Sequence, residues 1–118
     1  MDRKLSAKIK KYEAIILAYL NYKVTIKAAN LPDCQYLVLS DKEQHHYQLL
    51  TMGWQGYEYV HSISIHLSIA ENGKIWIHVN WTDIDIAALF VEQGVPKSDI
   101  VLGFRKEYMR EFSEYAVK

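Results

Sequence analysis

The segment from position 57 to 80 constrains the fold more than any other part of the sequence. Apolar and polar residues alternate between positions 57 and 69, which is the period of a β-strand with one buried face. A second short run, at about 74–80, follows Asn72-Gly73, a pair that is a strong hairpin signal. We therefore predict two antiparallel strands, 57–69 and 74–80, joined at this pair.

Side-chain parity decides how these two strands pair. A two-residue turn at Asn72-Gly73 would mix apolar and polar residues on both faces. A three-residue loop, 71–73, instead produces one wholly apolar face, because it pairs Ile69 with Ile75, Leu67 with Ile77 and Ile65 with Val79. Each buried aliphatic side chain contributes about 1.5–3 kcal/mol. We therefore predict the three-residue loop, with Gly73 at positive φ in a bulge and Ser68 opposite Trp76.

The same register gathers histidines on the opposite, polar face. His66 falls opposite His78, and His46 shares the face if a strand at about 45–52 keeps Tyr47 in the core. Three imidazoles could bind zinc, but the sequence supplies no obvious carboxylate beside them to orient the rings. We therefore expect this face to be a polar protein–protein interface, with no bound metal and no other cofactor.

Two segments have helical patterns. Apolar residues recur every three or four positions in residues 3–20, at Leu5, Ile9, Tyr12, Ile16 and Tyr19. A second helix is predicted over 83–93, with Thr82 as its cap and Gly94 as its stop. This helix is apolar on nearly all sides and includes Phe90, so we expect it to lie deep in the core or against a partner.

The predicted elements define the fold class. A further β-rich run occupies 34–40, a turn is expected at 53–56, and residues 101–102 form only a short extended piece. The prediction is an α+β fold with an antiparallel meander sheet of about four strands, packed against the N-terminal helix and the helix near 83–93. A chain of 118 residues is expected to form one domain, 1–118.

Charge and composition bear on location and on nucleic acid binding. The formal net charge is zero, although residues 1–30 carry an excess of five positive charges. A duplex-DNA binder usually has a basic excess over the whole domain, so DNA contact through Lys4, Lys8 and Lys11 is a lesser alternative to a solvated helix face. There is one cysteine and no apolar run near the roughly 20 residues of a membrane span. We expect a cytoplasmic protein with no membrane association.

The aromatic residues indicate binding to other proteins. Nine tyrosines and three tryptophans are present, and aromatic side chains are enriched at protein interfaces. The expected partner-binding residues are Trp54, Trp76, His66, His78 and Phe90. Half of the residues are hydrophobic, which is more than a one-layer sheet with a few helices covers easily. We therefore also predict self-association, most simply as a two-fold dimer.

Residues capable of catalysis do not form a recognisable set. Cys34 lies in a predicted strand without a base partner, so we expect a buried thiol. Asp83 and Asp85 stand at a predicted helix N-terminus, where carboxylates complement the helix dipole. We predict that the protein is not an enzyme.

Four blocks in one order resemble the XisI family, the fdxN-element excision-controlling factors known mainly from cyanobacteria. They are His46-Tyr47-Gln48-Leu49-Leu50, Gly53-Trp54-Gln55-Gly56, Gly73-Lys74-Ile75-Trp76-Ile77 and the segment 92–104, Glu-Gln-Gly-Val-Pro-Lys-Ser-Asp-Ile-Val-Leu-Gly-Phe. The sequence departs from the family pattern at Trp81, Arg105 and Ser113-Glu114-Tyr115.

The resemblance implies a compact α+β protein with an antiparallel sheet and no assigned catalytic residues. It also implies a regulatory role in site-specific DNA excision, together with an XisH-like partner that resembles endonucleases and with a separate recombinase, XisF. Two alternatives stay open at this point. The protein could restrain an XisH-like nuclease as an antitoxin does, or it could contact DNA directly through its basic first helix.

Overall fold

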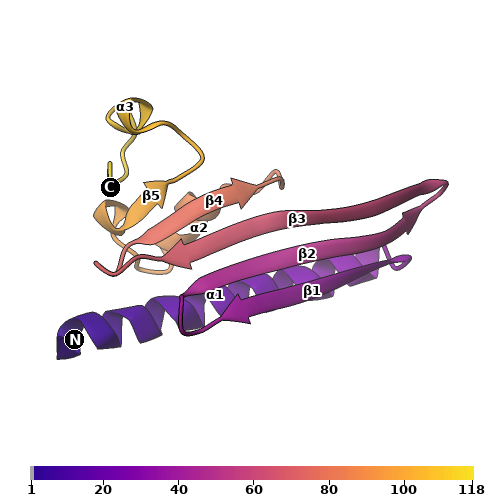
Figure 1. Cartoon of the computed structure of the whole chain (residues 1–118), viewed down its shortest axis with the longest axis horizontal. Coiled ribbons are helices and arrows are strands. Elements are labelled where there is room, and N and C mark those ends of the chain that lie inside the picture. Colours follow the sequence, from indigo (N-terminus) through magenta and orange to yellow (C-terminus); the bar gives the residue numbers. More distant parts are fainter. Residues whose placement is uncertain (1) are drawn as a thin grey trace.

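A computed structural model describes residues 2–118 and shows one sheet with two helices, α1 and α2, behind it (Figure 1). In spatial order the strands are β1 (Cys34–Asp41), β2 (His46–Gln55), β3 (Glu58–Ile69), β4 (Ile75–Asn80) and β5 (Ile100–Leu102). The helical elements are α1 (Arg3–Asn30), α2 (Ile86–Glu92), the 3-10 turn η1 (Lys97–Asp99) and α3 (Glu107–Arg110). In this part of the chain, no helix combines the length and the apolar character that crossing a membrane requires.

The α+β fold class is confirmed, with five strands instead of about four. Strands β1 to β4 form the predicted antiparallel meander. Strand β5, predicted only as an extended piece, pairs with β4 in parallel. A parallel pair requires a crossover connection, and here the segment that contains α2 carries the chain from the end of β4 back to the start of β5.

The predicted hairpin between β3 and β4 is confirmed. Ile69 lies opposite Ile75, Leu67 opposite Ile77, and Ser68 opposite Trp76. The loop holds the three residues 71–73, because the Ala70 N–H donates to the Lys74 carbonyl at 2.9 Å. Gly73 has φ +82°, as the bulge requires.

The register prediction is wrong beyond Leu67, because β4 contains a bulge. His66 lies opposite Val79, not His78, and Ile65 lies opposite Asn80, not Val79. His78 is thus the extra residue, inserted between two paired neighbours. An extra residue locally bends its strand and re-aims its side chain, which a strict two-residue period does not anticipate.

The predicted alternation of β3 is also wrong, because this strand contains a second bulge. Leu49 pairs with Ile65 and Leu50 pairs with Ile63, so Ser64 is the extra residue. Its hydroxyl is buried against that of Thr51, with the two oxygens 2.9 Å apart. Upstream of Ser64 the parity is reversed, and the single continuous face predicted for 57–69 does not exist.

The two long elements extend beyond their predicted ends. Strand β2 continues through Gln55, so the turn predicted at 53–56 narrows to the tip at Gly56, which has φ +63°. Helix α1 runs to Asn30 instead of ending at residue 20. Its last third lacks a clear apolar stripe because most of its side chains are exposed or half-buried, and a pattern based on burial therefore misses it.

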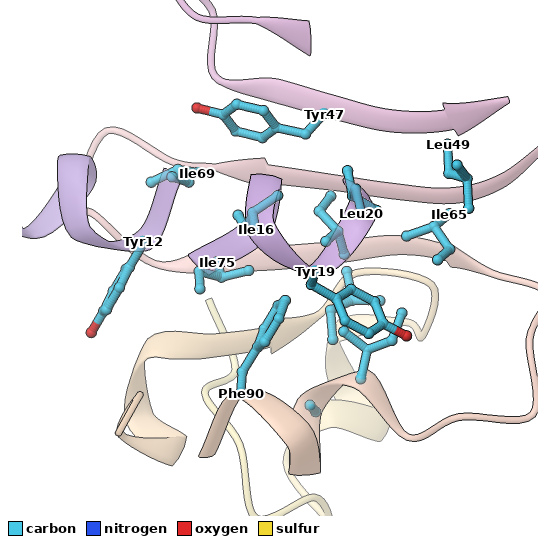
Figure 2. Close-up of a cluster of buried hydrophobic side chains, with 14 of the residues drawn as sticks. Tyr12, Ile16, Tyr19, Leu20, Tyr47, Leu49, Ile65, Ile69, Ile75 and Phe90 are labelled. Atoms are coloured by element: carbon cyan, nitrogen blue, oxygen red, sulfur yellow. The ribbon is translucent and has the colours of Figure 1, made fainter. Parts of the chain in front are cut away.

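The core lies between α1, α2 and one face of the sheet (Figure 2). The helix α1 contributes the buried residues Ile9, Tyr12, Ile16, Tyr19 and Leu20. Their neighbours on the sheet include Tyr47, Leu49, Ile65, Ile69 and Ile75, all fully or almost fully buried. The Tyr12 hydroxyl donates to the Asp99 carboxylate at 2.6 Å, which ties α1 to the C-terminal part of the chain.

The helix predicted over 83–93 is shorter and begins later. Asp85, not Thr82, is the N-cap of α2, and its carboxylate accepts a hydrogen bond from the Ala88 N–H at 3.0 Å. The Thr82 hydroxyl instead donates to the Asn80 side chain at 2.6 Å. Gly94 follows the helix end with φ +99°, as predicted for the stop.

Candidate functional site

Helices α1 and α2 lie behind the sheet and leave its opposite face uncovered, and within residues 2–118 only the segment with the short α3 packs against one end of that face (Figure 1). We call this face the open face. On this face, β2, β3 and β4 present imidazole and indole rings, whereas β1 and the neighbouring part of β2 present the exposed or half-buried leucines Leu37, Leu39 and Leu50. Three of the sequence-predicted residues, His46, His66 and His78, lie here on the adjacent strands β2, β3 and β4.

The three imidazoles form one cluster. One nitrogen from each ring lies within 4.8 Å of the corresponding nitrogens of the other two. His46 Nδ1 and His66 Nε2 are 3.0 Å apart, and the ring centroids of His66 and His78 are 4.7 Å apart. His46 is exposed, whereas His66 and His78 are half-buried. The sequence predicted that the three share a face, but the bulge at His78 sets how they meet.

The surroundings keep two of the imidazoles, those of His66 and His78, neutral. Burial, followed by the positive charges that His66 and His46 would carry, lowers the pKa of His78 to about 4. Burial and His46 also lower the pKa of His66 below its ordinary value. Both rings are therefore uncharged at neutral pH, with a lone pair on one nitrogen each.

Neighbouring side chains fix the position of His78. Its Nε2 lies 2.7 Å from the Ser68 hydroxyl, and the ring stacks beside Trp76 at a centroid distance of 6.0 Å. The Arg110 guanidinium lies over the Trp76 ring, 4.9 Å from its centroid, and its Nη1 donates to the Val117 carbonyl at 2.8 Å. The C-terminal segment thereby packs against this end of the open face.

A shallow cavity of about 310 Å³ adjoins the cluster. Its lining residues are Leu39, Ser40, Asp41, His46, Gln48 and His66. Asp41 lies directly across from His46 in the β1–β2 ladder. Its carboxylate accepts hydrogen bonds from the backbone N–H groups of Gln44 and Glu43, and these lower its pKa. Asp41 is thus an anionic group near the imidazoles. The sequence pattern did not indicate this position, because Asp41 lies on a different strand.

Exposed aromatic side chains lie close to β4 and β5, in the segments that follow these two strands. Trp81, Phe104 and Phe112 are 82%, 54% and 83% exposed, respectively. Phe104 borders two cavities, one of about 180 Å³ shared with His78 and Trp81 and one of about 420 Å³ shared with Phe112. We call these three residues the aromatic surface. The sequence reasoning missed it because aromatic residues in loops carry no periodic signal.

The other predicted contact residues lie in different places. Trp54 is exposed near the tip of the β2–β3 hairpin, with its ring 5.2 Å from that of Tyr59. Phe90 is fully buried and packs edge-on against Tyr19, so its ring lies inside the core and not on a surface that a partner could reach. Cys34 is buried, as expected, with its Sγ 3.9 Å from the Trp54 carbonyl oxygen.

The three lysines of α1 that are candidates for DNA contact differ in their exposure and in their ion pairing. Lys4 and Lys11 are exposed. The Lys8 ammonium instead lies 3.0 Å from the Asp99 carboxylate, and its charge is therefore engaged within the protein. The three lysines consequently do not form a uniformly free basic stripe.

Comparisons with known proteins agree with this architecture. The sequence pattern of the family described as "XisI protein" matches residues 6–117. The crystal structure of a XisI-like protein from Anabaena variabilis superposes with a TM-score of 0.85 at 34% identity, covering 93% of this chain and 99% of that one.

A second crystal structure, the fdxN element excision controlling factor XisI from Anabaena variabilis, has a TM-score of 0.76 and 31% identity. The match covers 94% of this chain and 99% of that one. No curated protein matches the sequence. Because the family pattern spans nearly the whole chain and both relatives exceed 30% identity over more than 90% of it, this chain belongs to the XisI family.

Proposed function

We propose that this protein is a non-catalytic regulator of the excision of a DNA element. The observation that carries the proposal is its similarity, along almost its entire length, to a protein described as an excision controlling factor. The open face supports a binding role, because it presents imidazole and indole rings on a rigid sheet. Tryptophan is enriched at protein interfaces.

The proposed partner is an XisH-like, endonuclease-related protein. We assign the contact to Trp76, His66 and His78 together with the aromatic surface. His78, Trp81 and Phe104 border one cavity, and Phe112 shares a second cavity with Phe104. Trp54 lies apart from this patch, near the hairpin tip, and is not included in the assignment. Large aromatic residues that become buried on binding often contribute 2 kcal/mol or more each to affinity.

Co-purification tests this assignment. The chain would be produced together with an XisH-like protein from the same genome, and the complex captured through a tag on the partner. The double variant Trp81→Ala/Phe112→Ala should weaken binding by at least about 30-fold. Tyr57→Ala is the matched control, because Tyr57 is a fully exposed aromatic residue at the distant hairpin tip.

The outcomes separate the two parts of the proposal. Failure to capture any complex with the unaltered chain would contradict the regulatory partnership. A complex that tolerates the double variant as well as it tolerates Tyr57→Ala would leave the partnership but remove the aromatic surface from it.

The proposal includes self-association as a two-fold dimer. Leu37 and Leu39 are 41% and 43% exposed on β1, and Leu50 beside them on β2 is half-buried. A second copy would cover these apolar side chains, and closed two-fold pairs are the commonest homo-oligomers. Sedimentation velocity at micromolar concentration should show a species of twice the 13.8 kDa chain mass, and a monomer alone would contradict it.

The antitoxin-like alternative would use the same contact surface and differs only in outcome. An assay of nuclease activity with and without this protein distinguishes restraint from support. Direct DNA binding has weaker support, because Lys8 is paired with Asp99 and the whole chain carries no net charge. Binding that weakens steeply with salt and is lost in Lys4→Ala/Lys11→Ala would favour it.

A further inference from the structure

We propose that His46, His66 and His78 form a binding site for a divalent transition-metal ion of the zinc class. The site rests on side-chain geometry and does not depend on the proposed excision role. It revises the interpretation reached from the sequence, in which these residues were expected to contribute only to a polar interface.

The positions of the three nitrogens support this site. A tetrahedral zinc ion holds imidazole nitrogens at about 2.0–2.1 Å, which places them about 3.4 Å from one another. His46 Nδ1 and His66 Nε2 are 3.0 Å apart, joined by a hydrogen bond that a bound ion would replace. One nitrogen of each of the three rings lies within 4.8 Å of the other two. No two of these nitrogens therefore have to approach by more than about 1.4 Å, a distance that side-chain rotation can supply.

The backbone brings His78 to this position by a local irregularity. His78 is the extra residue of the bulge in β4, and without the bulge it would lie in the regular ladder opposite His66. Bulges are frequent beside functional sites, where they re-aim a side chain. The bulge here places the third imidazole against the other two, at 4.7 Å from His66 and 6.1 Å from His46 between ring centroids.

The chemistry of the donors suits zinc-class ions. Neutral imidazole is a good ligand for zinc, copper, nickel and cobalt, whereas calcium and magnesium prefer oxygen. In the metal-free arrangement the Ser68 hydroxyl bonds to His78 Nε2 at 2.7 Å, and a bound ion would replace this bond. Three protein ligands leave one coordination position open.

Space for a fourth ligand adjoins two of the three histidines. His46 and His66 line the cavity of about 310 Å³ on their side of the sheet, and Asp41 lines it with them. Water or a small anion could therefore complete the coordination from the cavity. The Asp41 carboxylate, across from His46, would offset the charge of the ion.

Metal titration of the full-length chain, purified without a polyhistidine tag and stripped with a chelator, tests the site. Zn²⁺ binding would be measured by calorimetry, and Co²⁺ would report coordination through its visible absorption. We expect one ion per chain and an absorption spectrum typical of four-coordinate cobalt. His66→Gln and His78→Gln should each weaken Zn²⁺ binding by at least about tenfold.

The matched control is His61→Gln, which removes another exposed histidine from the same strand, β3. Circular dichroism of each variant establishes that it is folded, and Zn²⁺ binding by His61→Gln should equal that of the unaltered chain. Absence of stoichiometric binding by the unaltered chain would overturn the proposal. Binding that persists unchanged in folded His66→Gln and His78→Gln would overturn it as well.

Discussion

The two faces of the sheet differ sharply although the same strands build them. Leu49 and Leu50 are neighbours on β2, yet Leu49 is fully buried under α1 and Leu50 is half-exposed on the open face. The face toward α1 is filled with aliphatic residues and tyrosines, whereas the open face carries the imidazole cluster and Trp76. The comparison teaches that burial holds the fold on one face and leaves the other face free for binding.

The largest expected effect tests this difference at adjacent residues. Leu49→Ala should lower the free energy of unfolding by about 2–5 kcal/mol, because it leaves a cavity in the core. Leu50→Ala removes the same atoms from a half-exposed position and should cost less than about 1 kcal/mol. Chemical denaturation of both variants measures the difference. Equal losses would contradict the assignment of the two faces.

Tyr47 tests a polar contact within the buried face. Its ring is fully buried, and its hydroxyl donates to the Glu13 carboxylate of α1. Tyr47→Phe should cost about 1–3 kcal/mol, because the partly buried carboxylate loses a donor. Glu13→Gln keeps an acceptor for the hydroxyl and serves as the comparison in the same denaturation experiment. A Tyr47→Phe variant as stable as the unaltered chain would show that this hydrogen bond makes no net contribution to the free energy of unfolding.

Gly73 tests the turn that sets the register of both faces. Gly73→Ala should lower stability by about 1–2 kcal/mol, because a non-glycine residue is strained at positive φ. An added Cβ would also lie 2.9 Å from Leu5 Cδ1. Gly56→Ala is the control, since Gly56 also has positive φ but no atom of residues 2–118 lies within 4 Å of the added Cβ. A loss at Gly73 no greater than at Gly56 would exclude a contribution from crowding.

A further test belongs to the open face and concerns the dependence of stability on pH. The pKa of His78 in the folded chain is about 4, below the ordinary value of 6.5. The unfolded chain therefore takes up a proton first as pH falls, so the metal-free protein should lose stability between about pH 6.5 and 4. His78→Gln should remove part of this loss of stability. Above pH 7, the free energy of unfolding of the variant should change with pH as it does in the unaltered chain. A pH dependence unchanged by the substitution would contradict the lowered pKa.

Much of the architecture could be predicted because it depends on local patterns. The hairpin at 71–73 followed from matching aliphatic residues across two strands, and the first half of α1 followed from its apolar stripe. The two bulges could not be predicted, because the extra residues, Ser64 and His78, fit a regular alternation equally well. Only the packing of the whole sheet makes the irregular register favourable.

The candidate site could be predicted only in part, because local patterns indicate the face on which a residue lies but not its distance from other residues. Parity placed the three histidines on one face, but their mutual distances depend on the bulge at His78. Asp41 and the aromatic surface came together only through the fold, because neighbouring strands and loops distant in sequence contribute them. Phe90 was misassigned because an apolar helix buried in a core has the same composition as one at an interface.

Hydrogen–deuterium exchange with and without an XisH-like partner tests most directly whether the open side of the molecule is the binding side. Binding there should slow exchange in the segments 76–86 and 103–112, which include the aromatic surface, and should leave α1 unchanged. Slowed exchange confined to α1, or no change anywhere in a verified complex, would contradict the account. In that account the face toward α1 stabilises the fold and the open face binds the partner.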